Sequence, residues 1–262
     1  MLGAIAGDII GSRFERHNVK STNFTLFTDQ SRFTDDSVMT MAIAHALLQC
    51  RADPSLAAQA AVKSMQRYGR TWPWAGYGGK FLQWIASDDP QPYCSYGNGA
   101  AMRVSPCAWA ARSLEHALAL AQCVTAVTHD HPESIKAAKA VTSAVWMARQ
   151  GASAAEIGAH IQEHYYALDF TLDAIRPSYR FDVSCQGSVP QAIMAFIEAK
   201  DFEDAVRLAV SIGGDSDTIA AITGSIAEAA HGIPPFIRQH VLDRLEQRQI
   251  RMLEQFGQAF HV

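Results

Sequence analysis

Apolar residues recur at three- and four-residue spacing along most of the chain, and this spacing is typical of one buried face of an α-helix. The pattern predicts helices over the ranges 36–50, 55–68, 114–127, 132–149, 153–164, 188–199, 202–211, 217–230 and 235–256. A further short helix of small residues is expected at Gly3–Asp8. Alternating strand patterns are scarce, and the one short candidate, Phe24–Phe27, also suits a loop.

Proline and glycine separate these helical segments, at Asp53-Pro54, Asp89-Pro90, His131-Pro132, Gly187, Gly213-Gly214 and Pro234-Pro235. No low-complexity linker, charge run or internal repeat divides the chain. We therefore expect one compact, all-α, multi-helix domain that spans residues 1–262. The polar residues suited to chemistry lie at the breaks between helices, where distant segments can meet at one end of a bundle.

Composition narrows the choice of function and compartment. Hydrophobic residues make up 48% of the chain, which is enough to bury a sizeable core. The net charge of -4 argues weakly against a nucleic-acid binder, because such proteins usually carry a basic stripe. The five cysteines are odd in number and include no C-x-x-C pair, so neither a disulfide framework nor a zinc cluster is expected. With no signal-peptide pattern and no long apolar stretch, we expect a cytoplasmic protein without a membrane partner.

Two clusters of aspartate and hydroxyl residues lie where predicted helices begin: Thr34-Asp35-Asp36 and Asp215-Ser216-Asp217-Thr218. Taken alone, each cluster also suits helix capping, because threonine and aspartate are favoured N-caps and acids complement the helix dipole. If the two helix starts converge, four carboxylates share a small volume, and each pair about 4 Å apart repels by roughly 4 kcal/mol. Mg²⁺ or Mn²⁺ relieves this repulsion, because both ions prefer oxygen ligands. Together the clusters favour a metal site.

Two glycine-containing loops are candidates for ligand binding. The first, Ser95–Arg103 (here the Asn98 loop), has two glycines beside Asn98, which favour exposed amides that can hold phosphate; a hairpin is the alternative. The second, Gly76–Gly79 (the Gly76 loop), suits a phosphate cradle and a plain turn equally well. His129 lies at a helix end, where we favour a hydrogen bond to a ligand over helix capping or zinc binding.

Five motifs follow one another along the chain: Gly7–Glu15, Thr34-Asp35-Asp36, Ser95–Arg103, Thr128-His129 and Gly213–Thr218. In this order they closely resemble the ADP-ribosyl-glycohydrolase family, which includes the dinitrogenase reductase-activating glycohydrolase. Any one motif is weak, whereas five in the family's order, spread from about Gly3 to Gly232, are specific.

The resemblance implies an all-α fold with a binuclear centre that holds two Mg²⁺ ions, with Mn²⁺ as the alternative. It assigns metal ligation to Thr34, Asp35, Asp36, Asp215, Asp217 and Thr218. It gives Glu15 a gating or acid–base role, with Asp35 and Asp36 as further candidates for catalytic carboxylates. It implies contacts to ADP-ribose from Gly76, Gly78, Gly79, Ser95, Tyr96, Gly97, Asn98, Gly99, Met102 and His129.

We therefore expect a metal-dependent hydrolase that cleaves the glycosidic bond between ADP-ribose and a modified acceptor, through an oxocarbenium-like state. Its partner is ADP-ribose or an ADP-ribosylated molecule, and a nucleic acid enters only as a modified substrate. One alternative is a relative that binds ADP-ribose without hydrolysing it. Another is a D-x-D-x-T phosphatase built on Asp215 and Asp217, whose chemistry needs a strand before the motif. The short stretch between Glu15 and Thr34 leaves little room for loops that recognise a protein target, so the acceptor stays open.

Overall fold

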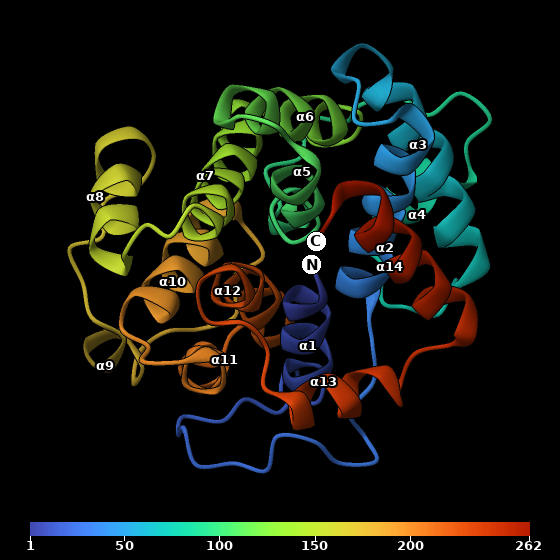
Figure 1. The fold of residues 1–262 in the computed structure, drawn as a ribbon. Coiled ribbons are helices and arrows are strands. Elements are labelled where there is room, and N and C mark those ends of the chain that lie inside the picture. The colour runs from blue at the N-terminus through green and yellow to red at the C-terminus, as the bar shows by residue number, and fades with distance from the viewer.

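The computed structural model describes residues 1–262, which form helices joined by loops (Figure 1). The helices are α1 Leu2–Gly11, α2 Asp35–Cys50, α3 Pro54–Thr71, α4 Gly79–Ala86, α5 Ser105–Ala110, α6 Leu114–Ala126, α7 Pro132–Arg149, α8 Ala154–His164, α9 Leu172–Ile175, α10 Cys185–Ile197, α11 Phe202–Ser211, α12 Ser216–His231, α13 Pro235–Leu242 and α14 Gln247–Phe260. A 3₁₀ turn covers Asn98–Ala100, and the segment Phe24–Phe27 is a loop. The all-α expectation is confirmed.

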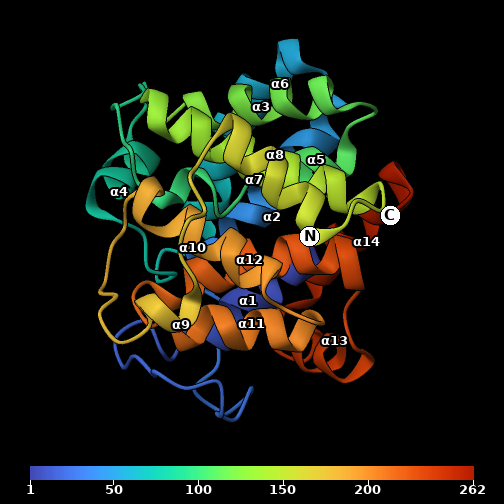
Figure 2. The ribbon, with the colours of Figure 1, turned by 90° about the vertical axis from the view of Figure 1, so that its left-hand side faces the viewer.

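Helices α1, α2 and α12 lie in the middle of the molecule, and the others surround them (Figures 1 and 2). Every residue of α1 is buried, as is most of α12, because both helices are apolar or small-sided nearly all round. The outer helix α14 is amphipathic and buries only Gln249, Met252 and Phe256. None of the helices combines the length and apolar character that a membrane span requires. Because α1 and α12 are buried and otherwise apolar or small-sided, the polar groups that they carry are unusual and mark the candidate site.

Glycines let the backbones of α1 and α12 touch. Gly3, Gly7 and Gly11 recur every four residues of α1 and so lie on one side of the helix. A Cβ atom on Gly7 would lie 1.9 Å from the carbonyl oxygen of Ala220, and one on Gly11 would lie 2.6 Å from the Cα atom of Asp217. No side chain fits between these helices, so the segment that follows Gly7 is held directly against the start of α12.

Most predicted helices agree with the structure within a few residues: α2, α3, α6, α7, α8, α11 and α12, while Gly3–Asp8 lies inside α1. The short helices α4, α5 and α9 are not predicted from the hydrophobic spacing. One or two turns are too short to repeat an apolar pattern.

Two expected boundaries are wrong. The range 235–256 holds two helices, because Glu246 and Gln249 form a capping box that starts α14, with the Glu246 N–H donating to Gln249 Oε1 at 2.7 Å. Gly187 does not break a helix: α10 begins before it, and the Gly187 N–H donates to the N-cap hydroxyl of Ser184 at 3.1 Å. In both places local capping decides where the helix starts.

Candidate metal centre

Three carboxylates from the three central helices lie together: Asp8 of α1, Asp36 of α2 and Asp217 of α12. One oxygen atom of each lies within 4.8 Å of the others, and all three residues are buried. We call these residues the acid cluster. The structure thus brings together one aspartate from each acidic helix start and adds a third, Asp8, that no role was expected for.

Asp8 is held by the segment that carries the first acidic motif. Its Oδ1 accepts a hydrogen bond from Thr34 Oγ1 at 2.7 Å, and its Oδ2 accepts from the backbone N–H groups of Thr34 and Ser37 at 2.9 and 3.1 Å. The Ser37 hydroxyl also donates to Oδ2. Through these four hydrogen bonds from Thr34 and Ser37, Asp8 fixes the start of α2 against α1.

The two motifs do not cap their helices through side chains, although Asp35, Asp36 and Asp217 do lie in first turns, where acids complement the helix dipole. Thr34 and Asp215 occupy the N-cap positions of α2 and α12, but neither side chain makes a capping hydrogen bond. The hydroxyls of Thr34 and Thr218 both approach Asp36 instead, each at 3.3 Å from its Oδ2. These polar groups therefore point toward the acid cluster and not toward the helix backbone.

Burial raises the pKa of each acid in the cluster. For Asp8, burial outweighs the hydrogen bonds from Ser37 and Thr34 and raises the pKa to about 6. For Asp36 and Asp217, burial and then the neighbouring carboxylates raise the pKa well above its ordinary value. In addition, Asp36 Oδ1 is buried without any hydrogen-bond partner. An unpartnered buried acceptor among carboxylates is costly, and a hard divalent cation removes both costs, so the donor set fits such an ion.

Asp35 and Asp215 lie beside the acid cluster, and each connects it to a glycine loop. Burial first, and then Asp8, raise the pKa of half-buried Asp35 to about 7. The Asp35 N–H donates to the carbonyl of Ala75 at 2.9 Å, and a Cβ atom on Gly76 would lie 3.3 Å from Asp35 Oδ1. Asp215 Oδ2 accepts from Asn98 Nδ2 at 2.7 Å. The six predicted ligands therefore lie in one region, with a glycine loop on each side.

The Asn98 loop is fixed by the segment before α10. Its Asn98 N–H donates to the carbonyl of Val183 at 2.8 Å, and the Cys185 N–H donates to the carbonyl of Tyr96 at 2.9 Å. The hairpin alternative is wrong, because the loop continues into a 3₁₀ turn. Tyr96 is 55% exposed and open to a ligand, whereas Met102 is buried in the core.

His129 lies behind the Asn98 loop as a neutral imidazole. Burial, and secondarily Arg103, lower its pKa well below the ordinary value. Its Nδ1 lies 2.7 Å from Thr128 Oγ1 and 3.4 Å from Arg103 Nη2. Since arginine only donates, Nδ1 accepts and Nε2 carries the proton. Cβ atoms on Gly97 and Gly99 would lie 3.7 and 3.4 Å from Nε2, so this donor faces the loop.

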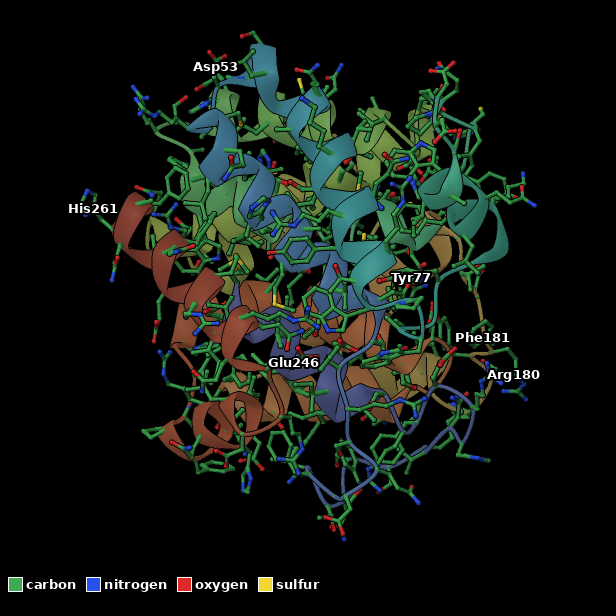
Figure 3. The ribbon with its side chains drawn as sticks, turned by 90° about the vertical axis from the view of Figure 1, so that its right-hand side faces the viewer. Asp53, Tyr77, Arg180, Phe181, Glu246 and His261 are labelled. Carbon is green, nitrogen blue, oxygen red and sulfur yellow. The ribbon has the colours of Figure 1, made fainter.

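The Gly76 loop is open by comparison. Gly76 has φ +114°, and no atom lies within 4 Å of a Cβ placed on Gly78 or Gly79. Between these glycines Tyr77 is buried, and its hydroxyl has no hydrogen-bond partner. In Figure 3 Tyr77 lies within the outline of the molecule, and Arg180 and Phe181 lie at its edge. Burial and the charge of Asp35 raise the pKa of Tyr77, which places this hydroxyl close to the site as a neutral donor.

Sequence reasoning gave no role to Asp8 or Tyr77. Asp8 leaves a signal, because it is the one charged residue of an otherwise apolar and small-sided helix, and such a group needs a buried partner. Tyr77 leaves none, because a tyrosine between glycines is compatible with any turn.

Glu15 lies in the loop between α1 and α2 and is half-buried. Its negative charge contributes to raising the pKa of Asp35, Asp215 and Asp217. The carboxylate therefore acts on both acidic motifs at once, from outside the acid cluster.

The phosphatase alternative is wrong. The segment before Asp215 is helix α11 followed by the turn Gly213-Gly214, and no strand precedes the motif. The position that a D-x-D-x-T pattern reserves for threonine holds Ile219.

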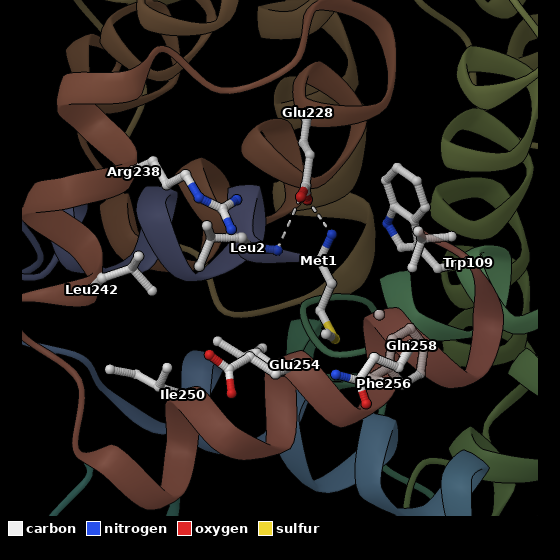
Figure 4. Close-up of a pocket in the computed structure, with 13 residues that line it drawn as sticks. Met1, Leu2, Trp109, Glu228, Arg238, Leu242, Ile250, Glu254, Phe256 and Gln258 are labelled. Atoms are coloured by element: carbon white, nitrogen blue, oxygen red, sulfur yellow. Dashed lines mark hydrogen bonds and ion pairs between the residues drawn. The ribbon is translucent and has the colours of Figure 1, made fainter.

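A separate cavity of about 530 Å³ lies between α1, α12, α13 and α14 (Figure 4). Its wall includes Met1, Trp109 and Glu228, and the Glu228 carboxylate pairs with the amino group of Met1. None of the predicted site residues lines this cavity. The acid cluster is therefore the better candidate for chemistry.

Comparisons with known proteins give matches along nearly the whole chain. A family model described as ADP-ribosylglycohydrolase matches residues 1–261. ADP-ribosylhydrolase ARH3 of Mus musculus is 26% identical, over 89% of this chain and 83% of its own length. ARH3 of Homo sapiens is also 26% identical, over 89% and 84%. ADP-ribosylarginine hydrolase Tri1 of Pseudomonas putida is 26% identical over 58% of this chain and 42% of its own.

A solved structure described as an ADP-ribosylglycohydrolase-related protein complex has the same fold, with a TM-score of 0.72 at 24% identity over 99% of this chain and 95% of that one. The alignments with both ARH3 proteins span 309 positions, more than the 262 residues of this chain. The ARH3 proteins therefore carry insertions that this chain lacks.

Proposed function

The chain belongs to the ADP-ribosylglycohydrolase family, and from this premise we propose that it is a metal-dependent hydrolase that releases ADP-ribose from a modified acceptor. The observation that carries the proposal is the unpartnered, buried Oδ1 of Asp36 inside the acid cluster. Native proteins rarely leave such an atom without a partner, and a cation supplies one.

The ligand set follows from which oxygens are free. Asp36, with Asp217 beside it, lies at the centre, and Asp35, Asp215, Thr34 and Thr218 complete the set. We assign Asp8 to orienting Thr34, because four hydrogen bonds from Thr34 and Ser37 already hold its carboxylate. Partners of this kind hold first ligands in place and typically affect metal affinity about 10–100-fold. Bound Mg²⁺ or Mn²⁺ supplies positive charge that orients ribose hydroxyls and makes water a stronger nucleophile.

Glu15 is the proton-transfer group of the proposal. It is half-buried, so it reaches both solvent and the site, and its charge acts on both acidic motifs. Asp35 is the second candidate, because it is half-buried beside the acid cluster and its carboxylate lies next to Gly76 of the open loop. General acid–base catalysis contributes about 10²–10⁴-fold.

The two glycine loops and His129 bind ADP-ribose in this proposal. The Nε2–H of His129 and the exposed backbone of Gly78 and Gly79 offer donors to phosphate or ribose oxygens. Within the Asn98 loop, Tyr96 presents an exposed ring, which suits stacking on a flat group.

The test is a set of peptides ADP-ribosylated on arginine or on serine, together with ADP-ribosylated nucleic acid, each incubated with Mg²⁺, Mn²⁺ or EDTA. We expect release of ADP-ribose from at least one substrate, only with metal, and its loss in Asp36→Asn. The matched control is Asp88→Asn, which removes the charge of an exposed aspartate outside the site. Calorimetry with ADP-ribose and metal runs in parallel. Metal-dependent binding of ADP-ribose without turnover on any substrate would contradict the hydrolase and support a binding protein.

A further inference from the structure

One loop side chain ties the Glu15 segment to the second acidic motif. Asn18 Nδ2 donates to the carbonyls of Phe14 at 2.6 Å, of Glu15 at 3.1 Å and of Gly214 at 2.9 Å. Asn18 Oδ1 accepts from the Gly214 N–H at 2.8 Å. The Asn18 carboxamide therefore binds the carbonyls of Phe14 and Glu15, and also the carbonyl and the N–H of Gly214, the residue before Asp215.

Lys20 adds a second connection between the same two segments. Its ammonium group donates to the carbonyl of Ile212, and to the carbonyl of Tyr179 at 2.8 Å. The group also lies 5.9 Å from the centre of the Tyr179 ring. The loop after Glu15 is thus attached on both sides of the Gly213-Gly214 turn.

The turn is shaped to receive these side chains. Gly213 and Gly214 have φ +71° and +76°, a left-handed backbone that favours glycine. A Cβ atom on Gly213 would lie 3.0 Å from both Asn18 Oδ1 and Lys20 Nζ. The double glycine therefore serves the loop attachment as well as the turn.

Without an attachment, the Glu15 loop would move away from the site. Glu15 is half-buried, whereas Arg16, His17 and Asn18 after it are exposed, so little burial holds this part of the loop. The loop has no helix or strand of its own between Gly11 and Asp35 to resist such movement. Before Glu15 the chain is held by the buried Phe14, whose carbonyl accepts from Ser216 Oγ at 3.5 Å; after Glu15 it is held by the hydrogen bonds of Asn18 and Lys20.

We propose that Asn18 is a positioning residue, which holds Glu15 against the Gly213–Thr218 segment so that its carboxylate stays over the reacting bond. The inference rests on the proposed function, in which Glu15 transfers the proton. Lys20 supports the same attachment from the other side of the turn.

The test compares Asn18→Ala and the isosteric Asn18→Asp with the matched control Asn23→Ala. Asn23 is an exposed asparagine of the same loop whose side chain makes no hydrogen bond in the structure. We expect kcat to fall about 10–100-fold in both Asn18 variants, because a displacement near 1 Å can cost about 100-fold. KM and the Mg²⁺ affinity should change less than about threefold, and the control should match the wild type.

A double-mutant cycle separates positioning from mere loop stability. If Asn18 acts through Glu15, Asn18→Ala should lower kcat no further in a Glu15→Gln background. An equal additional loss in that background would overturn the proposal, as would a kcat within twofold of wild type in Asn18→Ala.

Amide hydrogen exchange tests the attachment even if no substrate is turned over. Asn18→Ala should speed exchange of the Gly214 N–H at least tenfold, while the Thr218 N–H in α12 stays protected. Unchanged exchange at Gly214 would refute the attachment. Failure to hydrolyse any ADP-ribosylated substrate, with faster exchange at Gly214, would refute only the catalytic part and the proposed function.

Discussion

The acid cluster and the Gly76 loop both lie next to Asp35, and they are built in opposite ways. In the cluster, α1 and α12 touch through their backbones, and Asp8 is fixed by hydrogen bonds from the start of α2. In the loop, Gly78 and Gly79 have no neighbouring atoms where a side chain would be. The difference indicates that the carboxylates of the acid cluster are placed before any ligand arrives, whereas the loop is free to adapt to one.

The largest effect on activity is expected from Asp36→Asn, the centre of the rigid region. Activity should fall by more than about 100-fold, because even residues that only orient metal ligands cost about 10–100-fold. Without metal, the variant should be more stable than the wild type, because the substitution removes one carboxylate from a buried group of carboxylates. Calorimetric Mg²⁺ titration and urea unfolding measure the two effects. Loss of activity with undiminished Mg²⁺ affinity would show that Asp36 is not a ligand.

Gly7→Ala tests whether the backbone contact places the cluster. The added methyl group would meet the Ala220 carbonyl at 1.9 Å, so α1 must move away from α12. Overpacking of this kind costs about 1–3 kcal/mol, and we expect the upper end because the obstacle is backbone. Thermal unfolding measures the loss, and Mg²⁺ affinity should weaken because Asp8 and Thr34 move with α1. Unchanged unfolding temperature and Mg²⁺ affinity would mean that the helices do not need this contact.

The sequence predicts most of this arrangement, and the exceptions have physical causes. Hydrophobic spacing predicts the long helices, and the two acidic helix starts taken together predict a metal site. The structure brings one aspartate of each start, Asp36 and Asp217, into one cluster. Spacing along the chain does not show that Gly7 and Ala220 touch, since that contact joins distant segments. The attachment through Asn18 is hidden for the same reason, because any exposed loop asparagine has the same appearance in the sequence.

A smaller effect is expected from pH in the metal-free protein. The pKa of Asp35 is raised to about 7 in the folded state, against an ordinary value of 3.8, so the unfolded chain ionises this group at lower pH. Rising pH therefore destabilises the fold progressively from about 3.8 to about 7, and no further above that. Urea unfolding midpoints should be measured for wild type and Asp35→Asn at pH 4, 6 and 8. As pH rises, the midpoint of the wild type should fall relative to that of the variant. Parallel midpoints would show that Asp35 ionises normally.

Saturating Mg²⁺ is the internal control for this pH effect. Bound cation favours the ionised carboxylate and should remove or reverse the divergence between the two proteins. A divergence that persists unchanged with Mg²⁺ would place Asp35 outside the metal centre.

The smallest effect is expected from Gly79→Ala, in the open region. Gly79 is the first residue of α4, and no atom lies within 4 Å of the position that the new methyl group takes. Replacing a helical glycine by alanine at an unstrained site stabilises by about 0.4–1 kcal/mol, mainly by restricting the unfolded chain. Thermal unfolding should therefore shift upward by a few degrees at most. Replacing glycine by alanine is thus expected to lower the stability at Gly7 and to raise it at Gly79, since Gly7 faces backbone and Gly79 faces solvent. If Gly79→Ala instead destabilised the protein, the Gly76 loop would be as tightly packed as the cluster, and the contrast between the two regions would disappear.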